Sequence, residues 1–131
     1  MRDNERTSAL RTFTIAFLVV YAPIETWYSW PELWDPYYVV DFVGIVLLAW
    51  GAMSHRGNAG FRNLAVLAAG FGWTAANFWR ALFDRVFEVA EGTALDYGWM
   101  ELCFSGCIML GAIIGMGWTV VVATRSSIAG T

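Results

Sequence analysis

Five ionisable residues lie inside, or at the edge of, long apolar stretches of this sequence. They are Glu25, Asp41, Arg80, Asp84 and Glu101. A charged side chain in the hydrocarbon core of a membrane costs at least ~2.5–3.5 kcal/mol, so each of the five is expected to face protein, water or a ligand. Carboxyl groups held together away from water share protons and serve as general acids and bases. We therefore predict that Glu25, Asp41 and Glu101 are the acid–base residues of a site.

These residues are predicted to form one layer near the outer face of a membrane. Glu25, Asp41 and Glu101 each lie about four to five residues inside their apolar segment, or roughly 6–8 Å at the rise of an α-helix. Arg80 approaches the same level, but one arginine cannot neutralise four acids. A shared proton, a bound cation or open water is needed to balance the layer. In the structural alternative, Arg80 pairs with one acid and the layer only fixes the helix positions.

Aromatic and polar residues recur on the same helix faces as the acids, at alternating spacings of three and four. Those predicted to contact a ligand are Tyr21, Tyr28, Trp73, Asn77, Trp79, Arg80, Asp84 and Ser105. Aromatic faces beside carboxylates suit a cationic amine or a developing carbocation. For Trp73, packing in the helix core is the alternative.

The elements that must position these side chains follow from hydropathy. Of the 131 residues, 58% are hydrophobic and only 15% are charged, against about 25% charged in an average soluble domain. Four stretches reach the roughly 20 apolar residues that a membrane-spanning helix needs: about 9–30, 36–54, 61–83 and 97–123. We predict an all-α, polytopic membrane protein, in which residues 1–131 form a single antiparallel four-transmembrane-helix bundle.

Orientation is predicted from arginine, because the chain has no lysine. Six of the eight arginines lie on the N-terminal arm, the second connection and the C-terminal tail: Arg2, Arg6, Arg11, Arg56, Arg62 and Arg125. The positive-inside rule then places both termini in the cytoplasm. The expected location is a multi-pass position in a bacterial inner membrane. The alternative that the first segment is a secretory signal peptide is disfavoured, because its apolar run continues past Pro23.

Several kinds of chemistry are not expected. The net charge of −3 argues against nucleic acid as a partner. His55 is the single histidine, and Cys103 and Cys107 project away from Glu101 around their helix, so neither a metal site nor a cofactor is predicted.

The predicted function is an outward-facing, acidic and aromatic cavity within the membrane that binds a small apolar or cationic molecule. Candidate ligands are an isoprenoid, a sterol, a quinone, another lipid-like compound or an amine. Proton exchange with the bound molecule would make the protein an isomerase, cyclase or hydratase, and whether it is an enzyme stays open.

Two other functions remain alternatives. An accessory subunit of a larger membrane complex, or a homodimer surrounded by membrane lipids, fits a chain without soluble domains or cofactor motifs. Proton or cation conduction would use the same layer, although the helix faces below it are mainly apolar.

Overall fold

The computed structural model describes residues 2–30, 36–54, 60–93 and 98–128. These residues form four helices and no strand, so the all-α prediction is confirmed for this part of the chain. The helices are α1 (Arg2–Ser29), α2 (Pro36–Met53), α3 (Gly60–Ala90) and α4 (Gly98–Ile128).

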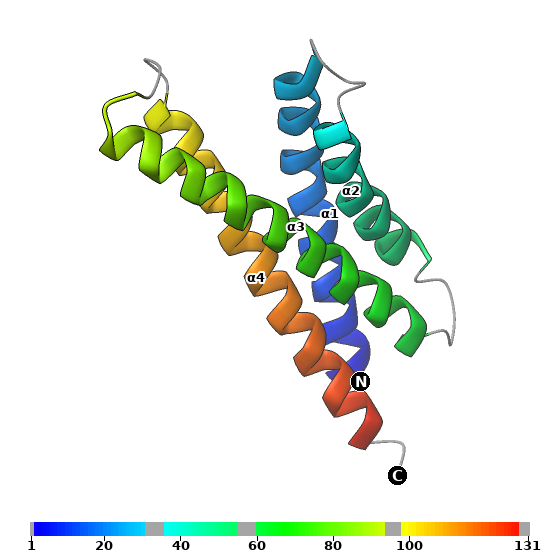
Figure 1. Cartoon of the computed structure of the whole chain (residues 1–131). Coiled ribbons are helices and arrows are strands. Elements are labelled where there is room, and N and C mark those ends of the chain that lie inside the picture. The colour runs from blue at the N-terminus through cyan, green and yellow to red at the C-terminus, as the bar shows by residue number, and fades with distance from the viewer. Residues whose placement is uncertain (1, 31–35, 55–59, 94–97, 129–131) are drawn as a thin grey trace.

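The helices alternate in direction and form an antiparallel bundle (Figure 1). α1 packs against α2 and α4, and α3 packs against the same two helices. The N- and C-termini lie together at one end, which we call the terminal end; the opposite end is the distal end. At the distal end, α1 and α2 lie apart from α3 and α4.

Two of the described helices are long and apolar enough to cross a membrane, judged by length and composition. They are α1, over Glu5–Trp27, and α4, over Gly98–Arg125. The apolar part of α2, Val39–Met53, is shorter. α3 carries Arg80, Asp84, Arg85 and Glu88 in its last third.

Glycine–leucine contacts set the register between α2 and α3. A side chain added at Gly51 would meet Leu67, and one added at Gly70 would meet Leu48. One turn further toward the distal end, Gly44 faces Thr74. Glycine lets two helix backbones approach closely, which locks a large side chain of one helix against the other. One more turn along this register places Asp41 opposite α3 at the level of Asn77.

Polar side chains close the terminal end of the bundle. The Arg11 Nε atom donates a hydrogen bond to the Ala52 carbonyl at 3.0 Å, which ties α1 to α2. The Asn63 side-chain amide donates to the Ser54 carbonyl at 2.7 Å. Because both contacts bridge different helices, they fix the relative heights of α1, α2 and α3.

The end of α3 lies seven residues beyond the predicted boundary at 83. Gly92 has a φ of +69° and donates its N–H to the Val89 carbonyl at 3.2 Å. The N–H of Thr93 donates to the Glu88 carbonyl at 2.9 Å. This pair of bonds is a Schellman cap, in which glycine adopts the left-handed conformation without steric cost. The cap, and not the end of the apolar run, therefore terminates α3.

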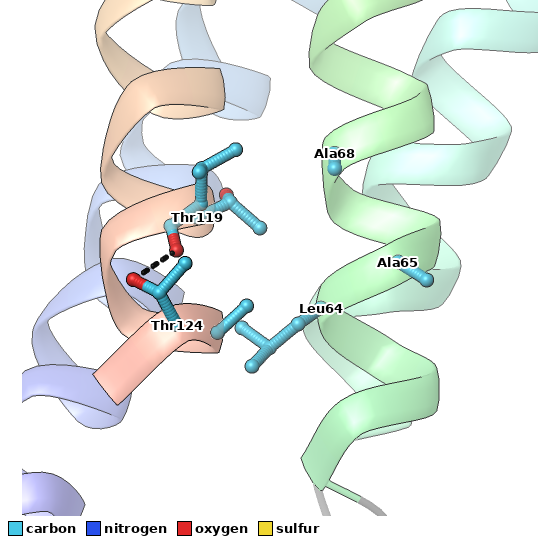
Figure 2. Close-up of a pocket in the computed structure, with 7 residues that line it drawn as sticks. Leu64, Ala65, Ala68, Thr119 and Thr124 are labelled. Atoms are coloured by element: carbon cyan, nitrogen blue, oxygen red, sulfur yellow. Dashed lines mark hydrogen bonds between the residues drawn. The ribbon is translucent and has the colours of Figure 1, made fainter. Parts of the chain in front are cut away.

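A cavity of about 130 Å³ lies between α3 and α4 near the terminal end (Figure 2). It is lined by Leu64, Ala65, Ala68, Thr119, Val120, Ala123 and Thr124. The Thr119 and Thr124 hydroxyls donate to the Gly115 and Val120 carbonyls, so the lining is apolar. This cavity is remote from Glu25 and Asp41, which belong to the distal half of the bundle.

Candidate functional site

A pair of carboxyl groups from two helices forms the centre of the candidate site. Glu25 of α1 is only 6% exposed, and Asp41 of α2 is half-buried. The two carboxyl groups lie within hydrogen-bonding reach of each other. Two fully ionised carboxylates so close together repel each other, so a pair of this kind favours a shared proton or a bound cation. The structure thus brings together two of the three acids that the sequence singled out.

Tyr21 lies one turn before Glu25 on the same face of α1, and its side chain is completely buried. Its hydroxyl lies beside Thr74 and within electrostatic range of both carboxyl groups. The Thr74 hydroxyl donates to the Gly70 carbonyl at 2.9 Å, and the Tyr21 oxygen has no hydrogen-bond partner of regular geometry. The ring packs edge-on against Phe78, with the centroids 5.5 Å apart.

Asn77 of α3 supplies a second buried donor without a partner, its side-chain amide nitrogen. The α2–α3 register places this residue at the level of Asp41. A buried polar group that makes no hydrogen bond costs about 1–3 kcal/mol, so such groups usually have a partner that completes them. Two such donors near one carboxyl pair are typical of a binding site.

Arg80 and Asp84 lie on the exposed surface of α3. Their side chains are 74% and 66% exposed, and the Arg80 Nε atom lies 3.8 Å from an Asp84 oxygen. An exposed i,i+4 pair of this kind contributes only about 0.3–0.5 kcal/mol. The two residues therefore differ in environment from Glu25 and Asp41.

Glu101 belongs to a separate ion-pair cluster centred on Arg85. The Arg85 Nε atom lies 3.0 Å from Glu101 on α4, and its Nη1 atom donates to Glu88 at 2.6 Å. The Glu101 side chain is 14% exposed. The sequence analysis did not identify Arg85 as a site residue, because the predicted helix ended at 83. The i,i+3 spacing of Arg85 and Glu88, followed by Gly92 as a helix cap, is the sequence pattern that indicates a longer helix.

The remaining predicted ligand residues occupy three different environments. Trp73 is partly exposed and its indole Nε1 donates to the Val40 carbonyl at 2.7 Å, which braces α2 beside Asp41. Trp79 is exposed, with its ring centroid 4.7 Å from that of Phe83. Ser105 is buried on α4. The side chain of Tyr28 lies outside the described residues.

The contact between Arg85 and Glu101 is expected to stabilise the distal half of the α3–α4 pair. In a double-mutant cycle with Arg85→Met and Glu101→Gln, we expect a coupling energy of about 1–2 kcal/mol, because the acid is nearly buried. Thermal unfolding in detergent measures it. The exposed pair offers a matched control on the same helix: Arg80→Met with Asp84→Asn should give a coupling below about 0.5 kcal/mol. Equal couplings would contradict this assignment.

In the part of the chain that the structure describes, no group of three or more His, Cys, Asp or Glu side chains could hold a metal ion. Comparisons with protein-family models, curated proteins and solved structures return no match for this chain. The function must therefore be argued from the site itself.

Proposed function

We propose that this protein is a multi-pass membrane protein that binds a small organic cation at the Glu25–Asp41 pair. In this proposal all four helices cross the bacterial inner membrane, with the terminal end in the cytoplasm. The support for this orientation is that six of the eight arginines lie on the N-terminal arm, the second connection and the C-terminal tail. The distal end, which contains the carboxyl pair, then faces outward.

The observation that carries the proposal is the pairing of two carboxyl groups beside the buried Tyr21 hydroxyl. Two acids from different helices offer a positively charged group up to four oxygen atoms in a poorly hydrated place, where electrostatic attraction is strong. The Tyr21 ring adds an aromatic surface, which favours ammonium groups.

A pair of matched ligands tests the proposal. Benzyltrimethylammonium carries a permanent positive charge, and neopentylbenzene has the same shape without the charge. We expect equilibrium dialysis of the protein in an uncharged detergent to show saturable, one-to-one binding of the cation. Electrostatic attraction between the cation and the carboxyl pair predicts at least a tenfold preference for the cation, equivalent to ~1.4 kcal/mol.

Empty detergent micelles at the same concentration provide the control for partitioning. Equal retention of the two compounds, or cation retention that does not saturate, would contradict a charge-recognising site.

A further inference from the structure

We propose that the Glu25–Asp41 pair exchanges a proton for the organic cation, so that each binding event releases a proton to water. This inference rests on the proposed function and adds how the site is regulated. Its consequence is that the affinity for the cation rises with pH.

The close approach of the two carboxyl groups is the first observation behind this inference. The Glu25 and Asp41 side chains lie within hydrogen-bonding reach of each other, and in this proposal they share one proton, which removes the repulsion between two carboxylates. A proton and an organic cation carry the same charge and compete for the same oxygens. When the cation binds, the O–H bond breaks, the electron pair stays on the carboxylate oxygen, and the proton leaves to water. The charge of the site is unchanged by the exchange, which avoids the cost of creating a new buried charge.

The two unpartnered donors are an independent observation, and the exchange explains them. While the carboxyl pair holds its proton, each acid already has a hydrogen-bond partner, and the Tyr21 hydroxyl and the Asn77 amide have none of regular geometry. Loss of the proton exposes new acceptor lone pairs on the carboxylates. A short rotation of Tyr21 or Asn77 would then supply donors to the ionised form. We infer that these residues position the deprotonated pair.

Among the described residues, Glu25 acts on Asp41, and Tyr21 lies within electrostatic range of both carboxyl groups. α1 contributes Tyr21, and α3 contributes the neutral side chains Thr74 and Asn77. At this level α4 places Ile108 against Tyr21 and Phe78. Arg85 and Glu101 face one another in their own ion pair. The pH dependence of cation binding is therefore assigned to Glu25 and Asp41.

Proton release can be measured directly with benzyltrimethylammonium, which has no dissociable proton of its own. The full-length protein in a weakly buffered, uncharged detergent solution is mixed with the cation, and a pH-indicator dye reports the protons released. We expect up to one proton per bound cation. In parallel, the dissociation constant should fall by as much as about tenfold per pH unit, as linkage of one proton to one ligand requires.

Three variants sharpen the measurement. The double variant Glu25→Gln/Asp41→Asn should release no protons. Asp84→Asn, which makes the same chemical change on the exposed surface of α3, should release as many as the wild type. Tyr21→Phe should unfold at the same temperature or higher, because it removes an unpartnered hydroxyl, but it should bind the cation severalfold more weakly at high pH.

The possible outcomes separate the two proposals. Saturable binding with no proton release and no pH dependence would overturn the exchange and leave the cation site standing. Absence of binding at every pH would overturn the cation site itself. Unchanged high-pH affinity in Tyr21→Phe would overturn the positioning role of that residue.

Discussion

Replacement of Gly115 with alanine is expected to destabilise the bundle by about 1–3 kcal/mol, the usual cost of overfilling a packed core. A methyl group at this position would lie 2.5 Å from two carbons of the Phe71 ring. Phe71 is completely buried and cannot swing aside, since its ring also packs against Phe13 and Phe17 with centroids about 6 Å apart. The substitution must therefore push α3 and α4 apart.

The matched control for this prediction is Gly117→Ala on the same helix. A methyl group at Gly117 meets no atom within 4 Å. Alanine is better than glycine in a helix by roughly 0.8–1 kcal/mol, so this change should be neutral or stabilising. The measurement is the temperature of unfolding followed by circular dichroism in detergent. If the two variants unfold at the same temperature, Phe71 does not occupy the position against α4 described above.

The helices could be predicted from the sequence because each apolar run is long enough to form a helix of about 20 residues. The same reasoning failed at the end of α3, where the charged residues that end the apolar run do not end the helix. The backbone continues to Ala90, because Arg85 and Glu88 pair one turn apart and Gly92 supplies the cap. Hydropathy indicates where a helix leaves an apolar environment. The capping residues indicate where the backbone hydrogen bonds of the helix end, and the two positions need not coincide.

The site was harder to predict from the sequence than the helices were. A polar stripe on a helix does not show whether it faces a neighbouring helix or the surroundings of the protein. On α3, the stripe that contains Trp73, Arg80 and Asp84 has large exposed side chains. The face that contacts α2 contains Gly70 and Thr74, and of the predicted ligand residues Trp73 reaches α2 through its indole N–H, while the Asn77 amide nitrogen is buried. Choosing between these faces requires the glycine–leucine register, which involves residues of two helices. Glu25 and Asp41 escaped this problem because each is the single acid of its predicted apolar segment.

Glu25→Gln and Asp41→Asn are each expected to weaken binding of benzyltrimethylammonium by about 10- to 100-fold, equivalent to ~1.4–2.8 kcal/mol. Each substitution removes one negative charge from a site in which Glu25 is nearly inaccessible to water. Folding should survive, because the new amide can donate to the remaining carboxyl group and replace the shared proton. Equilibrium dialysis gives the affinities, and unfolding temperatures within a few degrees of the wild type verify the fold.

Asp84→Asn is the matched control, because it changes the net charge of the protein by the same amount on the exposed surface of α3. If general attraction of a cation to an acidic protein were responsible for binding, all three variants would lose affinity to a similar, small extent, and salt would abolish the difference. Recognition by the buried pair predicts instead that Asp84→Asn stays within about twofold of the wild type. It also predicts that the effects of Glu25→Gln and Asp41→Asn are not additive, because both carboxyl groups contact the same ion.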